Sequence, residues 1–313
     1  MNQFELVTLS LDAMATRFEI VLYGADPSRL RAAGEEALAE IERLDRQLSF
    51  YRADSDVSWI NAHAAREPVK VEPGLFALLR LARQIHGDTD GAFDITVAPL
   101  MKAWGLAGGA GRVPSDREIA DALECVGMSR VRLQEADSTV FFERDGIQID
   151  LGAIGKGYAI DRAVETLRAN AIESALIHGG TSTLYGLGSP PGAQAWRVAV
   201  RGDTPLYPPS ARGKGHRVID LCDSSLSVSA VHGKSFVHDN RLYGHVIDPR
   251  SGRPSDRAAL AAVWGPLAAE TDALSTALLV LGKPGLRILK KRYREYRGMV
   301  VANSGESLIC GQE

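Results

Sequence analysis

Cysteine is scarce in this sequence, and the few that occur stand alone. The chain of 313 residues contains Cys125, Cys222 and Cys310, which lie far apart and form no Cys-x-x-Cys pair. This spacing supports neither a disulfide framework nor a zinc knuckle. The cysteine pattern therefore fits a protein of a reducing compartment.

Long apolar runs and blocks of like charge are also missing. No stretch reaches membrane-spanning length, and residues 1–6 lack the basic start, the apolar run and the lipid-attachment cysteine of an export signal. The net charge is −3, and the densest basic patch, residues 290–294, has the pattern of a solvated helix face. We therefore expect a cytoplasmic protein that binds neither membranes nor nucleic acid.

The short motifs of several large enzyme classes do not occur either. The sequence has no Gly-x-Ser-x-Gly, no His-Glu-x-x-His and no Gly-x-Gly-x-x-Gly after a strand pattern. This excludes the common hydrolase, metalloprotease and dinucleotide-binding routes. What remains is an ordinary globular composition, 45% hydrophobic, 24% charged and 6% aromatic, which allows one large domain or two smaller ones.

The most informative stretch is residues 149–161, where a strand pattern passes through a glycine turn into an amphipathic helix. We expect a strand at residues 148–151, and the helical spacing of apolar residues from Ile160 onward predicts a helix that ends near Asn170. Glycine lets backbone approach a ligand closely, and the N-terminus of a helix favours a phosphate group.

Lys156 lies in the first turn of this expected helix, where a cation opposes the helix dipole unless an anion is near. The stretch is not a P-loop, because Asp150 and Gly157 occupy positions where that motif has glycine and Ser or Thr. From this turn alone, a phosphate site and a glycine-rich crossover with an exposed lysine are equally compatible.

A second informative stretch is the apolar helix expected at residues 268–281, which Gly282 would terminate. Asp272, Ser275 and Thr276 share one face of it at spacings of i, i+3 and i+4. Oxygen ligands of this kind suit magnesium, and a buried carboxylate is costly unless it is paired or holds a cation. The alternative is that Asp272 caps the first turn while the hydroxyls bond back to preceding carbonyls.

The remaining elements follow from cap and periodicity signals. Asp26 and Pro27 form an N-cap and first-turn pair, which marks the start of the clearest helix. We expect helices at residues 27–48, 55–62 and 73–86, a hairpin of strands at 4–10 and 17–22, and a further sheet of strands at 196–200, 218–221 and 226–229.

Polar residues lie at three further places, each at the expected end of a helix or strand. Residues 92–94 follow a helix, and His245 and Asp248 lie in a strand that enters a turn. The pair suits either a polar site or the orientation of a backbone turn. His178 at a strand end is more simply interpreted as a hydrogen-bonded core histidine than as a catalytic one.

Taken together and in this order, four motifs resemble the ApbE family of flavin transferases, over a stretch from Met14 to Gly282. They are Ala92-Phe93-Asp94, Asp150-x-x-Ala153-x-x-Lys156, His245-Val246-Ile247-Asp248-Pro249 and Asp272-x-x-Ser275-Thr276. The resemblance implies one domain over residues 1–313 with an α+β fold, in which mixed β-sheets and packed helices form two interleaved subdomains around a flavin cleft.

The resemblance also implies an activity, that of a magnesium-dependent FAD:protein FMN transferase. Such an enzyme cleaves FAD, attaches FMN by a phosphoester bond to a Thr or Ser of a target flavoprotein, and releases AMP. The FAD contacts it implies are Met14, Tyr51, Ala92, Phe93, Asp94, Asp150, Lys156 and Val246. The Mg²⁺ ligands it implies are the backbone oxygen of Ala153 together with Asp272, Ser275 and Thr276.

The chemistry of this reaction assigns roles to three of the residues. Phosphoryl transfer needs negative charge neutralised on the phosphates and the attacking oxygen held in line. Lys156 and the magnesium at Asp272 would neutralise charge, and His245 or Asp248 would accept the proton of the attacking hydroxyl as general base.

Three departures from the family pattern are visible. Residues 14–16 read Met-Ala-Thr where the family usually has Met-Gly-Thr, and Ser275 stands where the family often has a second acid. Residues 229–233 replace a Ser/Thr-rich turn, a change that would either alter the choice of target or favour water as acceptor. The alternatives are therefore a magnesium-dependent FAD pyrophosphatase giving FMN and AMP, or a non-catalytic flavin-binding protein.

Overall fold

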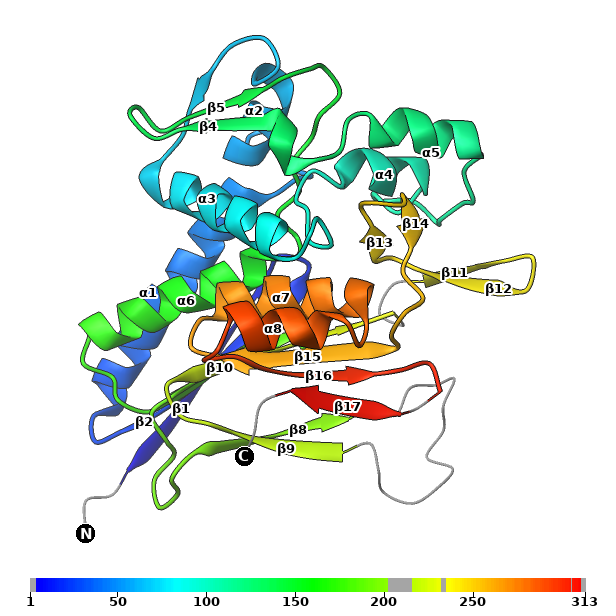
Figure 1. Ribbon diagram of the computed structural model, residues 1–313. Coiled ribbons are helices and arrows are strands. Elements are labelled where there is room, and N and C mark those ends of the chain that lie inside the picture. Colours follow the sequence, from blue (N-terminus) through cyan, green and yellow to red (C-terminus); the bar gives the residue numbers. More distant parts are fainter. Residues whose placement is uncertain (1–3, 202–215, 232–234, 305, 311–313) are drawn as a thin grey trace.

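A large antiparallel sheet with helices on one face organises the molecule (Figure 1). The computed structural model describes residues 4–201, 216–231, 235–304 and 306–310. The α+β class implied by the resemblance is confirmed. Among the described residues, helices with the length and apolarity needed to cross a bilayer are absent.

The large sheet has eight strands in the order β1-β2-β6-β7-β10-β15-β16-β17, and all neighbours are antiparallel. Strands distant in the chain therefore become neighbours, so that β7 and β15 flank β10 at the centre of the sheet. Their bounds are β1 (Glu5–Ala13), β2 (Thr16–Gly24), β6 (Ala175–Gly179), β7 (Thr183–Leu187), β10 (Ser224–Ala230), β15 (Leu260–Gly265), β16 (Arg297–Val301) and β17 (Ser307–Cys310).

Helices cover one face of this sheet. The first begins at Pro27 as expected, because the carboxylate of Asp26 accepts hydrogen bonds from Ser28 N and Arg29 N. The helix at residues 268–281 is buried on nearly all sides, which explains its apolar composition. The helices on this face are α1 (Pro27–Leu48), α6 (Gly155–Ala169), α7 (Ala268–Leu281) and α8 (Gly285–Arg292).

The opposite face is covered by a two-stranded pair, β8 (Trp196–Arg201) and β9 (His216–Leu221). The expectation that residues 226–229 belong with these strands is wrong, because β10 pairs with β7 and β15 instead. Leu226 of β10 faces the β8–β9 pair and the serines of β10 face α7, so β10 packs against that pair and does not belong to the same sheet.

The upper part of Figure 1 holds a small three-stranded sheet, short helices and two small β-hairpins. The predicted helices at residues 55–62 and 73–86 are confirmed as α2 and α3 with slightly different ends. The elements are α2 (Asp56–His63), β3 (Val69–Lys70), α3 (Pro73–Asp88), α4 (Ala98–Ala103), α5 (Asp116–Leu123), the 3-10 turn η1 (Met128–Arg130), β4 (Val131–Gln134), β5 (Thr139–Phe142), β11 (Ser235–His238), β12 (Arg241–Gly244), β13 (Ile247–Asp248) and β14 (Arg253–Pro254).

The strand expected at residues 148–151 is wrong. The Asn61 side chain takes the place of a neighbouring strand, since its amide donates to Ile149 O at 2.9 Å and its oxygen accepts from Ile149 N at 2.8 Å. Asp150 N then donates to Ile95 O at 2.7 Å. The backbone is satisfied without a ladder, so the apolar pattern is that of a buried extended segment.

Candidate active site

The centre of the candidate site is the place where the N-terminal ends of α6 and α7 meet. Neither helix has a side-chain cap from its own N-cap residue, Ile154 or Leu267. Each is capped by an acid of the other helix instead. Asp272 of α7 accepts from Gly157 N at 3.1 Å, and Asp161 of α6 accepts from the first two amides of α7 at 2.7 and 2.8 Å.

This exchange of caps requires glycine at position 157. A Cβ atom there would lie 2.1 Å from Ala268 O and 2.7 Å from Ala269 Cα. Only a residue without a side chain lets the two helix ends approach so closely. The glycine turn identified in the sequence therefore allows the close packing of α6 against α7, in addition to being a candidate ligand site.

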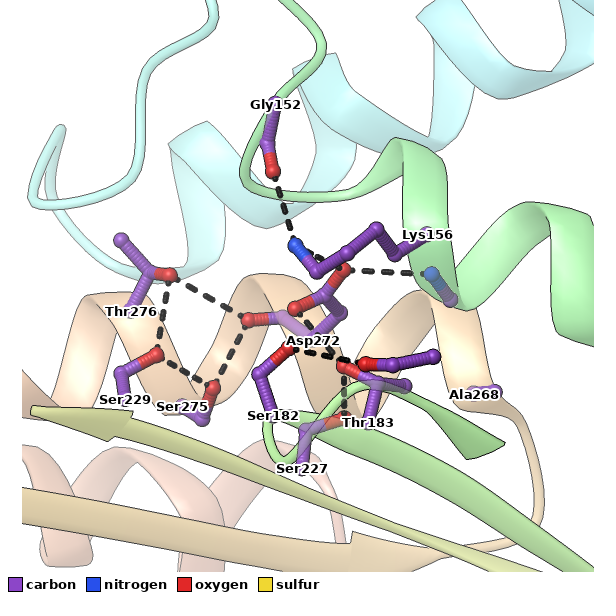
Figure 2. Close-up of polar contacts among 12 residues, drawn as sticks. Gly152, Lys156, Ser182, Thr183, Ser227, Ser229, Ala268, Asp272, Ser275 and Thr276 are labelled. Carbon is purple, nitrogen blue, oxygen red and sulfur yellow. Dashed lines mark hydrogen bonds and ion pairs between the residues drawn. The ribbon is translucent and has the colours of Figure 1, made fainter. Parts of the chain in front are cut away.

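The Asp272 carboxylate is buried at this contact, with 4% of the residue exposed. Lys156 Nζ lies 3.7 Å from its Oδ2 and donates to Gly152 O at 3.2 Å. Figure 2 shows the Lys156 side chain between Gly152 and Asp272. The predicted phosphate turn and the predicted metal helix, far apart in the sequence, thus lie against each other.

Two hydroxyls extend the polar group along α7. Ser275 Oγ and Thr276 Oγ1 both donate to Asp272 O, at 2.9 and 3.3 Å, as the alternative interpretation of this helix expected. Both also contact Ser229 Oγ of β10, at 2.8 and 3.3 Å (Figure 2). Asp272 caps α6, however, and not the first turn of its own helix.

The donor set at this place fits a hard divalent cation. Asp272 supplies a buried charge, and the hydroxyl of the partly buried Thr276 lies on the same helix face. Gly157 N, which would donate to Ala153 O in a regular helix, donates to Asp272 Oδ2 at 3.1 Å. Clusters of three or more His, Cys, Asp or Glu side chains suited to a metal do not occur in the described residues, so the predicted ligands depend on hydroxyl and backbone oxygens.

The Ala92-Phe93-Asp94 motif is buried, and its Ala92 lies at the C-terminal end of α7. Ala92 packs against the end of α7 together with Val246. Asp94 accepts from Thr96 N and Thr96 Oγ1 at 2.7 and 2.6 Å, and its other oxygen lies 3.1 Å from His86 Nδ1. The hydrogen bond with Asp94 raises the pKa of His86 above its ordinary value, so this pair favours a protonated histidine.

Asp150 and Tyr51 lie at the outer end of the glycine turn. Asp150 Oδ1 accepts from Gly152 N at 2.8 Å, which shapes the turn, and its own amide is tied to Ile95 O. Partial burial and, next, the charge of Asp150 raise the pKa of Tyr51. Tyr51 is nevertheless 69% exposed, so its ring is available to a ligand.

Asp248 is engaged by its own turn. Its carboxylate accepts from Arg250 N at 3.0 Å and from the Arg250 guanidinium at 2.8 Å to each oxygen. The Arg250 side chain lies next to Gly91, where a Cβ would be 3.6 Å from Arg250 Cγ. His245 is half-buried between β12 and β13. The Asp248 carboxylate thus shapes its own turn.

Met14 occupies the tight turn between β1 and β2. Met14 and Ala15 both have left-handed backbone, with φ of 49° and 56°, and Met14 N donates to Asp45 Oδ1 of α1 at 2.8 Å. Such hairpin turns favour glycine or asparagine. Alanine at position 15 therefore costs roughly 1 kcal/mol of backbone strain that glycine would avoid.

Two further expectations concern other parts of the chain. His178 Nδ1 is hydrogen bonded to Gly180 O at 3.1 Å, as expected, but its side chain is 32% exposed, so the expected core position is wrong. In the loop at residues 229–233, residues 232 and 233 lie outside the described part of the chain.

A cavity of about 670 Å³ beside Tyr23 and Pro190 contains none of the predicted site residues.

Several residues of this centre were not singled out from the sequence, namely Gly157 as a close contact, Asp161, Thr183, Ser227 and His86. One signal was available for Ser227, because serines alternate at residues 225, 227 and 229 and so share one face of a strand. The capping role of Asp161 had no signal, since the amides that it caps follow more than 100 residues later.

Comparison with known proteins agrees with this geometry. The model of the ApbE family matches residues 14–300. A protein of Treponema pallidum named FAD:protein FMN transferase is 31% identical over 283 residues, covering 86% of this chain and 77% of that protein. A protein of the same name from Vibrio cholerae is 28% identical over 310 residues, covering 96% of this chain and 86% of that protein.

Solved structures show the same fold. The ApbE protein of Thermotoga maritima superposes with a TM-score of 0.85 at 27% identity, covering 98% of this chain and 97% of that one. The flavinyl transferase ApbE of Pseudomonas stutzeri in its apo form gives a TM-score of 0.83 at 28% identity, with coverage of 98% and 94%.

Proposed function

This chain belongs to the ApbE family, and from that premise we propose that it is a magnesium-dependent FAD:protein FMN transferase. It is a transferase, in agreement with the names of its relatives. The finer proposal is that it joins FMN by a phosphoester bond to a Thr or Ser of a target flavoprotein and releases AMP. The observation that carries it is the contact of the buried Asp272 carboxylate with Lys156 and Gly157 N.

The proposed FAD site extends from this contact to the exposed end of the glycine turn. Met14, Tyr51, Asp150 and Val246 would line it together with residues 92–94. Ala92 and Val246 support this, since they pack together at the end of α7, and so does the bond from Asp150 N to Ile95 O, which ties the turn to the same motif.

The proposed metal ligands are Ala153 O, Asp272, Ser275 and Thr276. A magnesium ion bound there would neutralise charge on the diphosphate and polarise the phosphorus under attack. Lys156 adds a second positive charge from the first turn of α6, where the helix N-terminus also favours phosphate oxygens.

In the proposed reaction, the acceptor hydroxyl oxygen forms a bond to the phosphorus on the FMN side of the diphosphate. The bond from that phosphorus to the bridging oxygen breaks, and AMP leaves with this oxygen. The hydroxyl proton passes to a base. We assign this role to His245, because the Asp248 carboxylate is held by three hydrogen bonds from Arg250.

The test is incubation of the protein with FAD, Mg²⁺ and a candidate target domain. We expect flavin fluorescence on the target that survives denaturing electrophoresis, and a mass increase equal to one FMN minus water. Chelation of the metal should prevent both. Flavin that separates from the target on denaturation contradicts the proposal.

Two alternative functions give different results in the same assay. A pyrophosphatase releases free FMN and AMP when no acceptor protein is present, which is the outcome suggested by the altered loop at residues 229–233. A flavin-binding protein without catalysis gives no product, and its FAD affinity changes only moderately in Asp272→Ala, whereas this variant of either enzyme loses turnover.

A further inference from the structure

A row of buried hydroxyls leads from the large sheet to the Asp272 carboxylate. Thr183 of β7 donates to Asp272 Oδ1 at 3.2 Å, and Ser227 Oγ of β10 donates to Thr183 Oγ1 at 3.3 Å. Thr271 Oγ1 lies 2.9 Å from Ser227 Oγ and 3.1 Å from Ser225 Oγ. All four hydroxyl residues have no exposed surface.

The positions of these residues follow from the fold. Ser227 and Thr183 stand directly opposite each other in the β10–β7 pair, where hydroxyl side chains commonly bond across strands. Ser225 lies two residues earlier on the same face of β10, which faces α7. Thr271 directly precedes Asp272, so α7 brings both to this row.

The carboxylate fixes the direction of the two hydrogens nearest to it. An ionised carboxylate accepts only, so the Thr183 proton points to Asp272 and the Ser227 proton to Thr183. Farther along the row, the Thr271 hydroxyl has Ala268 O as an acceptor at 3.1 Å and the Ser225 hydroxyl donates to Gly265 O at 2.9 Å, so the carboxylate does not orient these two hydroxyls. Hydrogen bonds aligned in one direction polarise one another, so the row strengthens the last bond, which ends on Asp272 Oδ1.

We propose that Thr183 and Ser227 are positioning residues for the metal-binding carboxylate of Asp272. They hold Oδ1 toward the sheet and so direct Oδ2 toward Gly157 N and Lys156 Nζ, and the proposed divalent cation would bind on that side of the carboxylate. Figure 2 shows Asp272 between Thr183 and Lys156. This inference rests on the proposed function, because it takes that cation to be the magnesium of the transfer reaction.

The experiment measures binding of Mn²⁺ alone to the full chain, by titration calorimetry without FAD. Mn²⁺ accepts the same oxygen ligands as magnesium. Thr183→Val keeps the shape of the side chain but cannot donate, and we expect it to raise the Mn²⁺ dissociation constant about 10-fold, as loss of a group that orients a ligand commonly does. Ser227→Ala should raise it several-fold.

Two variants distinguish positioning from packing. Thr183→Ser restores the donor and should bind Mn²⁺ like the wild type. Ser174→Ala removes a partly buried hydroxyl that donates to Ser189 O at 2.7 Å, away from the site, and should also bind like the wild type. Thermal unfolding of each variant without metal reports whether it is folded, and Ser227→Ala carries the test if Thr183→Val is not.

Unchanged Mn²⁺ affinity in both Thr183→Val and Ser227→Ala overturns the positioning role while the transfer assay of the wild type still decides the proposed function. Equal losses in Thr183→Ser and Thr183→Val also overturn it, because packing would then be responsible. A wild type that neither binds Mn²⁺ nor transfers FMN overturns both proposals.

Discussion

Asp161 and Asp272 are two acids with the same structural task and very different surroundings. Each lies in the first half of its helix and caps the N-terminus of the other helix. Asp272 also has the Lys156 ammonium and the Thr183 hydroxyl beside it. At Asp161, by contrast, burial outweighs the two backbone hydrogen bonds and the charge of Arg162, and it raises the pKa to about 6, above the ordinary 3.8.

The difference distinguishes a carboxylate that only caps a helix from the one that we propose as a metal ligand. Two backbone amides are enough to hold Asp161, although burial works against its charge. Asp272 has an additional cation and an additional donor, more than a cap needs. A carboxylate with such surplus polar partners at a helix N-terminus is the better candidate for a metal ligand.

The sharpest test of this comparison exchanges each acid for its amide. Asp272→Asn keeps an oxygen for the cap but loses the charge, and we expect FMN transfer to fall about 1000-fold, as for loss of a main electrostatic contact. Asp161→Asn should transfer FMN within a few-fold of the wild type. The measurement is the rate of covalent flavin fluorescence on the target at saturating FAD. Equal losses in both variants would remove the distinction.

Gly157→Ala should separate the two helix ends. The new Cβ would lie 2.1 Å from the backbone oxygen of Ala268, which cannot move alone, so we expect the free energy of unfolding to fall by about 3 kcal/mol. Chemical denaturation measures it. Gly87→Ala in α3 is the control, because nothing lies within 4 Å of its Cβ, and it should gain up to about 1 kcal/mol. A Gly157→Ala protein as stable as the wild type contradicts the close contact.

Asp161 predicts a pH dependence of stability. Its folded pKa of about 6 exceeds the ordinary 3.8, so between these values the folded state binds more protons than the unfolded state. Stability then falls as pH rises from about 4 to about 6, by at most roughly 3 kcal/mol relative to Asp161→Asn. Denaturation of both proteins across this range is the measurement. Parallel pH profiles would show that Asp161 does not titrate there.

The smallest effect concerns metal-linked stability. At a Mg²⁺ concentration ten times its dissociation constant, the wild type should gain about 1.4 kcal/mol, seen as a rise of a few degrees in Tm. Asp161→Asn should gain the same, whereas Asp272→Asn should gain nothing. A metal-induced rise of Tm in Asp272→Asn would place the ion elsewhere.

Much of the fold could be predicted from local signals. The start of α1 follows from Asp26 and Pro27, and the helices after Ser55 and Glu72 begin at side-chain caps. The errors arose where a distant group replaced a local partner. Asn61 substitutes for a strand next to Ile149, and the sheet to which β10 belongs depends on pairing with β7 and β15, which no local pattern encodes.

In the candidate site, too, some features could be predicted from the sequence and others depend on distant residues. The resemblance to the ApbE family implied that Lys156 and Asp272 belong to one site, and in the structure Lys156 Nζ lies 3.7 Å from Asp272 Oδ2. The support of Asp272 by Thr183 and Gly157 could not be predicted, because these residues are 89 and 115 positions away in the chain. Sequence spacing identifies groups on one element, whereas their orientation depends on neighbouring elements.

The amide of Asn61 gives the glycine turn a chemical vulnerability. Its nitrogen donates to Ile149 O and its oxygen accepts from Ile149 N, so it needs both halves of the amide group. Deamidation to aspartate would leave an acceptor facing a carbonyl and put a new negative charge one residue from Asp150. Slow deamidation of this one side chain would thereby weaken the attachment of the segment that leads to the glycine turn. No residue that is predicted to contact a ligand would be altered.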